Sequence, residues 1–402
     1  MNRPCPRRTS LLSTSLLQKV TIAVLTLMLL ALLAAQPASA QKQKVLYSFT
    51  GGHDGQSPQS SLTPHGGNFY GTTYSGGLGF GTVFELSPSG GGWTETVLYA
   101  FSGGSDGRYP AYMSVIFDGA GNLYGTTVEG GTSNSGVVFE LTPNGQSWTA
   151  SVLYNFCSQA GCADGEYPVS SLIMDAAGNL FGVTDNGVFE LSPSGGSWTE
   201  QIIYNYGVES ENSSGLTKDA AGNIFGIIYV HTFTREYSKV FELSPNGDGW
   251  TPTILHKFSG VDANGTLALD QEGSLYGTTG PNNKNNGTIF KLTGTNGRWM
   301  KKTLHTFSGG DGNYPWGGIV FDAAGNIFGT TLYGGQYGFG TVFELAAPAH
   351  KNKYTEKILW NFNNTNGAVP VDSLFLDNSG TIYGTTTGGG SKGQGVVFQL
   401  TQ

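Results

Sequence analysis

The sequence is poor in charged residues and cysteines, and it lacks long apolar runs after its first 40 residues. Charged residues make up 12% of the chain, and only 3 of its 402 residues are cysteines. No later segment has the roughly 20 apolar residues that a membrane-spanning helix needs. No stretch keeps the 3.6-residue apolar spacing of an amphipathic helix, so we expect almost no helix.

Motifs of the common catalytic and cofactor sites are missing as well. There is no Gly-x-Ser-x-Gly elbow and no zinc-ligand spacing. The glycine-rich loops lack the Gly-Lys-Ser/Thr of a phosphate-binding loop. Calcium is harder to exclude, but each loop offers one carboxylate where calcium takes six to eight oxygens. We therefore expect no cofactor and no metal, and the sequence identifies no catalytic residue.

The first 40 residues differ in kind from the rest. Basic residues begin the chain, an apolar run covers 21–35, and Ala38-Ser39-Ala40 forms a small-residue cleavage site before Gln41. This order is typical of a secretory signal. A membrane anchor is the alternative, but the run is too short to span a bilayer. We expect a signal peptide over 1–40, a mature chain over 41–402, secretion to the periplasm or beyond, and no membrane insertion after cleavage.

Removing this segment takes away four basic residues and no acidic ones. The remaining 16 basic and 28 acidic residues give a net charge of −12, which argues against nucleic acid and anionic membranes as partners. Cys157 and Cys162 remain, and two nearby cysteines outside the cytoplasm predict a disulfide. A metal site is the alternative, but no histidine or second cysteine pair accompanies them.

Internal repetition dominates the rest of the chain. The sequence Val-Phe-Glu-Leu or a close variant occurs seven times, at intervals of 49 to 55 residues. Each unit contains four short apolar or β-branched segments separated by Asp, Asn, Gly and Pro turns, which predicts four strands. The copies lie at 83–86, 138–141, 188–191, 240–243, 289–292, 342–345 and 397–400.

Seven units of four strands predict an all-β protein, a single seven-bladed β-propeller of four-stranded blades. The mature chain opens with a fourth strand, 45–49, and ends with a third strand, 397–402. Pairing of these N- and C-terminal strands would complete one blade and leave no free sheet edge. A β-helix is the alternative architecture. We expect the propeller to be a monomer.

The repeat motifs resemble those of the choice-of-anchor tandem repeat GloVer-containing proteins, a family of exported bacterial repeat proteins. The resemblance rests on Leu-Tyr-Gly-Thr-Thr at 123–127, Gly-Phe-Gly-Thr-Val-Phe-Glu-Leu at 79–86 and Val-Leu-Tyr-Ala-Phe at 97–101. It extends over essentially all of 45–400. It implies an exported repeat protein and no established activity. Members often end in a sorting anchor. This chain stops at Gln402 inside its last repeat, so we expect free secretion.

Residues present in every repeat are most simply structural, because catalysis needs one constellation and not seven. Binding residues concentrate instead on long loops held by a rigid scaffold. The loops before strand one and after strand two share one face, which we call the loop face. There Asp-Gly-x-Tyr-Pro recurs at 106–110, 164–168 and 311–315. Aromatic rings beside carboxylates suit sugars; the alternative is that Tyr-Pro only holds each loop onto its blade. The candidate ligand-binding residues are Asp106, Asp164, Asp311, Tyr109, Tyr167, Tyr314 and Trp316.

The repeat symmetry breaks in the fourth unit. There 229–237 replaces a glycine-rich loop, which makes His231 and Arg235 candidates for a unique site; drift of a surface loop is the alternative. The leading hypothesis is an extracellular binding or scaffold module for a glycan or a protein. Two alternatives stay open, a propeller enzyme acting on polysaccharide or lactone at the channel mouth and a purely structural cell-surface protein.

Overall fold

The second repeat shows how each unit folds. Its first strand, β7 (Ile116–Phe117), turns back into β8 (Leu123–Thr127), and β9 (Val137–Asn144) and β10 (Ser147–Asn155) continue the antiparallel sheet outward. The computed structural model describes residues 41–402 except 113, 207–209, 214, 233–234, 248, 296, 349–352 and 402, and only the backbone of 210–213, 231–232 and 235–236. The expected signal peptide lies outside the described residues.

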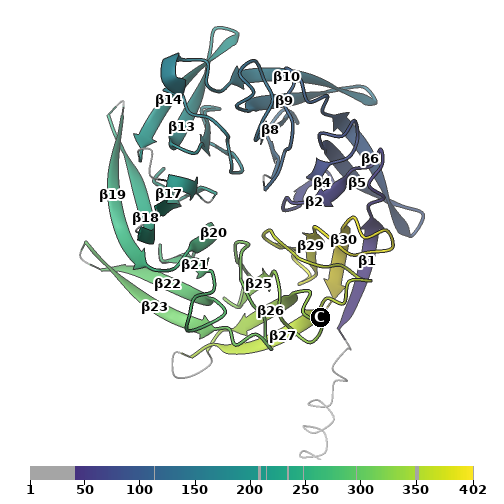
Figure 1. The fold of residues 1–402 in the computed structure, drawn as a ribbon, viewed down its shortest axis with the longest axis vertical. Helices are drawn as coiled ribbons and strands as arrows, with labels where there is room; N and C mark the ends of the chain where they lie inside the picture. Colours follow the sequence, from purple (N-terminus) through teal and green to yellow (C-terminus); the bar gives the residue numbers. More distant parts are fainter. Residues whose placement is uncertain are drawn as a thin grey trace, which may run out of the picture. The chain divides into compact units, whose positions relative to one another are not determined.

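Seven such sheets follow one another around a ring within the unit Gln41–Gln402 (Figure 1). The described residues contain one short helix, the 3-10 turn η1 (Ala160–Cys162). The seven-bladed propeller and the near absence of helix predicted from the sequence are confirmed. The first, innermost strands of the remaining blades are β2 (Gln56–Pro58), β3 (Thr63–His65), β11 (Ile173–Met174), β15 (Ser210–Ser213), β16 (Thr217–Lys218), β20 (Ala263–Leu269), β24 (Val320–Phe321) and β28 (Phe375–Leu376).

The other three strands of each blade are longer and lie progressively farther from the centre. The second strands are β4 (Asn68–Ser75), β12 (Leu180–Val183), β17 (Ile224–Thr232), β21 (Leu275–Thr279), β25 (Ile327–Thr331) and β29 (Ile382–Thr386). The third strands are β5 (Thr82–Ser89), β13 (Gly187–Ser194), β18 (Arg235–Asn246), β22 (Thr288–Thr295), β26 (Thr341–Ala346) and β30 (Val396–Thr401). The fourth are β6 (Gly92–Ala100), β14 (Ser197–Asn205), β19 (Gly249–Ser259), β23 (Arg298–Thr306), β27 (Thr355–Asn361) and β1 (Lys42–Ser48).

The turn between the first two strands depends on its aspartate. One oxygen of Asp118 accepts hydrogen bonds from the amides of Ala120 (2.9 Å) and Asn122 (2.8 Å), while Gly121 takes a φ of +87°. Such bonds from aspartate to nearby amides stabilise tight turns. The structural role predicted for these repeated aspartates is confirmed, since Asp175, Asp219, Asp270, Asp322 and Asp377 make the equivalent bonds.

The core lies between the blades and is built on the repeated phenylalanine of the third strands. Phe139 is fully buried and covers Gly125, where a Cβ atom would lie 2.6 Å from the Phe139 ring. The ring also packs edge-to-face on Phe101 of the preceding blade, with centroids 5.2 Å apart. Such pairs stabilise beyond their buried area. An equivalent pair joins every neighbouring blade: Phe49–Phe84, Phe156–Phe189, Tyr204–Phe241, Phe258–Phe290, Phe307–Phe343 and Phe362–Phe398.

The last blade contains strands from both ends of the mature chain. β1 pairs antiparallel with β30 from Lys42↔Thr401 to Ser48↔Val396, so it occupies the fourth-strand position of the sheet β28–β29–β30. Leu46 and Phe49 carry this strand's apolar side chains into the core. The predicted closure by terminal strands is confirmed, and it leaves the last blade with the same four strands as the others.

Candidate functional site at the mouth of the central channel

The two sets of long loops lie on one face, as predicted. The amide of Gly131, after the second strand, donates to the carbonyl of Gly104, before the first strand, at 3.0 Å. Equivalent bonds join Gly77 to Gly52 at 2.9 Å and Gly335 to Gly309 at 3.0 Å. This loop face therefore surrounds one end of the central channel.

The loop aspartates hold their own loops together. Asp106 accepts hydrogen bonds from the Tyr99 hydroxyl (3.0 Å), the Ser102 amide (2.8 Å) and the Ser102 hydroxyl (2.5 Å). Burial acts to raise its pKa, but these hydrogen bonds outweigh burial and hold the pKa below its ordinary value. Asp164 repeats the arrangement. In Asp311, His305 replaces the tyrosine at 3.0 Å. The three candidate carboxylates are thus engaged within their loops.

The Tyr-Pro pairs connect neighbouring blades through their backbone. The Tyr109 amide donates to Phe80 of the first blade (2.8 Å), and its carbonyl accepts from Val128 of the second (3.1 Å). Tyr109 adopts a φ of +58° to make both bonds, and Tyr167 and Tyr314 are similar at +50° and +62°. Ser57 and Val369 share this backbone, so the geometry does not need a tyrosine. The tyrosine side chains remain available for other contacts.

A cavity of about 380 Å³ opens at the loop-face end of the channel. It lies where the first strands begin and the second strands end, and six of the seven blades contribute to it. Of the predicted site residues, only Trp316 lines this cavity. Its lining is Tyr112, Val128, Val169, Gly215, Ile227, Tyr229, Ala263, Asn264, Gly265, Thr266, Trp316, Gly317, Gly318, Val371 and Asp372.

Aromatic side chains converge on this mouth from several blades. Tyr112, 49% exposed, has a pKa raised by burial of its ring and by the nearby phenolic groups of Tyr74 and Tyr333. Tyr74 stacks on Tyr109 with ring centroids 4.9 Å apart. Across the mouth, Tyr314 packs edge-to-face on Trp316 at 5.3 Å. Two of the predicted tyrosines, Tyr109 and Tyr314, therefore touch aromatic groups of the rim without lining the cavity.

Asp372 is the one charged side chain in the cavity lining. Its carboxylate accepts 2.7 Å hydrogen bonds from the amides of Ser61 and Ser373. Burial raises its pKa to about 6 despite these bonds. Beside it, Gly317 has no room for a side chain, because a Cβ atom would lie 2.6 Å from the Asp372 carbonyl oxygen. The cavity thus combines aromatic rings with a single carboxyl group that titrates near neutral pH.

Sequence analysis missed Asp372 and Tyr112. Asp372 stands two residues after a loop proline, where other repeats have Ser60, Ser170 or Gly317. This break in symmetry was visible, but only the loops after the second strands were searched for such breaks.

The fourth blade corrects one expectation. The stretch 229–237 is not a loop, because β17 continues to Thr232 and β18 begins at Arg235, with His231 opposite Glu236. Without glycine, this β-branched and aromatic stretch favours extended pairing. The side chains of His231 and Arg235 lie outside the described part of the structure. Tyr229 of the same hairpin lines the cavity.

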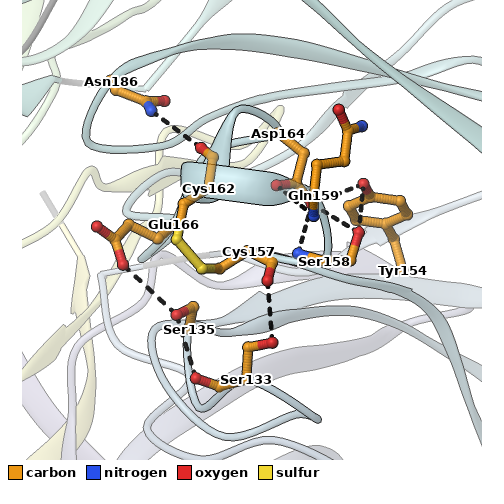
Figure 2. The surroundings of a disulfide bond; sticks show 10 residues. All are labelled: Ser133, Ser135, Tyr154, Cys157, Ser158, Gln159, Cys162, Asp164, Glu166 and Asn186. Atoms are coloured by element: carbon orange, nitrogen blue, oxygen red, sulfur yellow. Dashed lines mark hydrogen bonds between the residues drawn. A yellow bond between two sulfur atoms is a disulfide. The ribbon is translucent and has the colours of Figure 1, made fainter.

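The predicted disulfide joins Cys157 to Cys162 in the loop between the second and third blades (Figure 2). Ser133 donates to the Cys157 carbonyl at 3.0 Å, and Asn186 donates to the Cys162 carbonyl at 3.5 Å. Glu166 has an oxygen within 4.8 Å of both sulfurs. Sulfurs bonded to each other are not thiolate ligands, so this group favours a cross-linked loop over a metal site.

Solved structures share the architecture at low sequence identity. A Lactobacillus plantarum protein matches with a TM-score of 0.53 and 14% identity, covering 86% of this chain and 88% of that one. The polysaccharide lyase Uly1 matches at 0.51 and 12%, covering 91% and 94%. PorZ, a surface component of the type-IX secretion system of Porphyromonas gingivalis, matches at 0.51 and 14%, covering 86% and 46%. These similarities show the fold alone.

The fold and the mouth cavity define a closed seven-bladed β-propeller with one asymmetric channel mouth. No curated protein matches the sequence significantly. The model of the Gloeobacter/Verrucomicrobia repeat matches 32–188 and 212–402, so the chain belongs to this repeat family. The family resemblance seen in the sequence motifs is confirmed. In the described residues no helix is long and apolar enough to cross a membrane.

Proposed function

We propose that the protein is an exported carbohydrate-binding module that holds a sugar ring in the mouth cavity. The observation that carries this proposal is the placement of Trp316, Tyr112 and Tyr229 around a cavity whose lining includes Asp372. Cavities of this size, mostly apolar with a few polar groups, are typical of small-ligand sites. Export is supported by the disulfide, which persists in oxidising compartments.

The chemistry of the lining suits a sugar. A pyranose ring has apolar C–H faces that pack on aromatic rings and hydroxyl edges that need hydrogen-bond partners. Trp316 and Tyr112 offer such faces, and Asn264, Thr266 and Asp372 offer polar atoms in the same lining. Trp316 and Tyr314 retain the binding role expected of them. Tyr109 contributes through Tyr74, on which it stacks.

The direct test is a glycan array followed by calorimetry on the chain 41–402. We expect Trp316→Ala to weaken binding of any glycan hit at least about tenfold, because it removes the stacking platform. Tyr337→Ala is the matched control, since Tyr337 is 51% exposed on the same face and does not line the cavity. Absence of any glycan hit, or equal losses in the two variants, contradicts the proposal. A protein captured through Trp316 would instead support a protein-binding module.

Asp372 favours a second candidate, an enzyme acting on a polysaccharide or lactone. A carboxyl group with a pKa of about 6 can exchange a proton near neutral pH. In that case Asp372→Asn abolishes product formation while leaving glycan affinity within about threefold of wild type. Lack of turnover by the wild-type protein on every glycan it binds rules against this candidate and leaves the binding module.

A further inference from the structure

The outer rim of the propeller carries its positive charge on one side only. The outer strands β6, β10 and β14 of the first three blades contain no lysine or arginine. The outer strands of the next four blades carry, on or directly beside them, half of the 16 basic residues of 41–402. All eight are exposed: Lys42, Lys44, Lys257, Arg298, Lys301, Lys302, Lys353 and Lys357.

Three of these lysines occupy one equivalent position in consecutive blades. Lys302 pairs with Lys291, Lys357 with Glu344 and Lys44 with Gln399, each opposite the third residue of the Val-Phe-Glu-Leu motif or its variant. In the other four blades this position is also exposed but uncharged. The residues there are Thr96, Ser151, Gln201 and Thr253.

The strands that carry these lysines follow one another around the ring. β23, β27 and β1 form consecutive parts of its outer edge (Figure 1). The Gln41 amide, oriented to satisfy its hydrogen bonds, donates to Leu359 (2.8 Å) and accepts from Lys357 (3.3 Å), which places the start of β1 against β27. The three lysines therefore form a row along the convex rim. We call Lys302, Lys357 and Lys44 the rim lysines.

Little negative charge neutralises this row. Lys291, opposite Lys302, is a cation whose own partner is Asp270 at 3.0 Å. Glu344 lies opposite Lys357, and Gln399 opposite Lys44 is neutral. Glu356 on β27 is half-buried, and burial, followed by the charge of Asp311, raises its pKa. The row keeps an excess of positive charge on a protein that is otherwise acidic.

We propose that the rim lysines bind an acidic polysaccharide that runs along the outer edge of the propeller. A flexible polyanion can follow a convex row of point charges, and lysine suits carboxylate or sulfate groups without a fixed geometry. Duplex DNA has a persistence length of about 50 nm and cannot follow so tight a curve without a large bending cost. Single strands need aromatic platforms, and none of the exposed large apolar side chains on β23, β27 and β1 is aromatic.

This surface is separate from the mouth cavity, so its test does not depend on the sugar site. The chain 41–402 is assayed by surface plasmon resonance on immobilised dextran sulfate, with neutral dextran, duplex DNA and anionic lipid vesicles as comparisons. We expect binding to dextran sulfate that weakens steeply with salt, because charge neutralisation releases counterions. We expect Lys302→Gln with Lys357→Gln to lower affinity about tenfold. Blade three already carries Gln201 at this position, so both variants keep the fold.

Lys284→Gln with Lys392→Gln is the matched control. It removes the same charge from two exposed loop lysines, and we expect it to lower affinity less than about twofold. Equal losses in the two variants would show that net charge alone matters and would overturn the proposal. So would binding to DNA or vesicles as tight as binding to dextran sulfate, or no binding to dextran sulfate at low salt.

Discussion

The amide of Ser61 donates a 2.7 Å hydrogen bond to the carboxylate of Asp372, 311 positions later in the chain. Ser61 enters the first blade and Asp372 enters the seventh, so this bond links the two blades where the ring closes. The same carboxylate lines the mouth cavity. Ring closure and the candidate site thus share one side chain.

Replacing Asp372 should separate these two roles. Asp372→Ala leaves the Ser61 amide without its acceptor, and we expect a loss of about 1–3 kcal/mol in the free energy of unfolding. Asp372→Asn keeps an acceptor oxygen and removes a carboxyl whose charged form is disfavoured by burial. We expect it to be within about 1 kcal/mol of wild type at pH 7.5. Urea denaturation of both variants checks this. Equal stability of the alanine variant and wild type would show that the bond does not support the seam.

Two buried glutamates should make stability fall as the pH rises. Burial, followed by the charges of Asp54 and Asp164, raises the pKa of Glu95 and of Glu200 to about 8 from an ordinary 4.5. The folded protein then holds these protons more tightly than the unfolded chain does. Their stabilising contribution is complete below pH 4.5 and is lost as the pH rises through 8.

We therefore expect Glu95→Gln with Glu200→Gln to raise the free energy of unfolding at pH 8.5 by about 1–2 kcal/mol, a range reduced for solvent screening of these part-exposed groups. The change at pH 4.5 should be small. Blade two already carries Ala150 at the equivalent register, so the position tolerates a neutral residue. Glu272→Gln, in an exposed turn, is the control. Parallel pH–stability curves for the double variant and wild type would contradict the assignment.

The N-terminal strand should be essential for the closed ring. A chain starting at residue 51 lacks β1 and loses the buried side chains of Leu46 and Phe49, each contributing about 1.5–3 kcal/mol. It also exposes the β30 edge, a template for aggregation. We expect aggregation, or a melting temperature at least about 10 °C below that of the chain 41–402. Gel filtration and calorimetry distinguish these results from an unchanged monomer, which would mean that the strand pairing is dispensable.

Two glycines in one loop provide a matched test of the contact between neighbouring blades. A Cβ atom on Gly81 would lie 2.5 Å from the Thr73 carbonyl oxygen and 2.6 Å from the Pro110 ring, whereas one on Gly79 would meet nothing within 4 Å. Both have φ near +100°, so alanine is strained at each. We expect Gly81→Ala to cost about 2 kcal/mol more than Gly79→Ala, because only it also clashes. Equal costs measured by denaturation would show that the Pro110 contact yields easily.

Reduction of Cys157–Cys162 should loosen one loop and spare the ring. The disulfide closes a short segment, worth roughly 2 kcal/mol in the chain-entropy model. Asp164 still holds the loop through Tyr154 and Ser158 after reduction. We expect Cys157→Ser with Cys162→Ser to speed proteolysis within 157–168 while far-ultraviolet circular dichroism stays native. Global unfolding of this variant would show that the loop supports the blades.

The sequence predicted the fold because local and repeated signals carry it. The Asp118-type turn forms within five residues, and the Phe139-type core residue recurs in every unit. The deficit of one strand at each end predicted the β1–β30 pair without any structural information. The candidate site was predicted only in part. Trp316 lines the cavity and Tyr109 and Tyr314 touch the rim, while Asp106, Asp164 and Asp311 are bound within their own loops.

The sequence by itself determined the number of blades, their four-strand plan, the disulfide and the way the ring closes, because each follows from spacing along the chain. Only the tertiary structure decided which side chains meet at the channel mouth and which cations line the rim. Tyr112, Trp316 and Asp372 come from three different blades, and the rim lysines from three more positions some 50 residues or further apart. Their proximity arises from closing the ring, and no local pattern in the sequence encodes it.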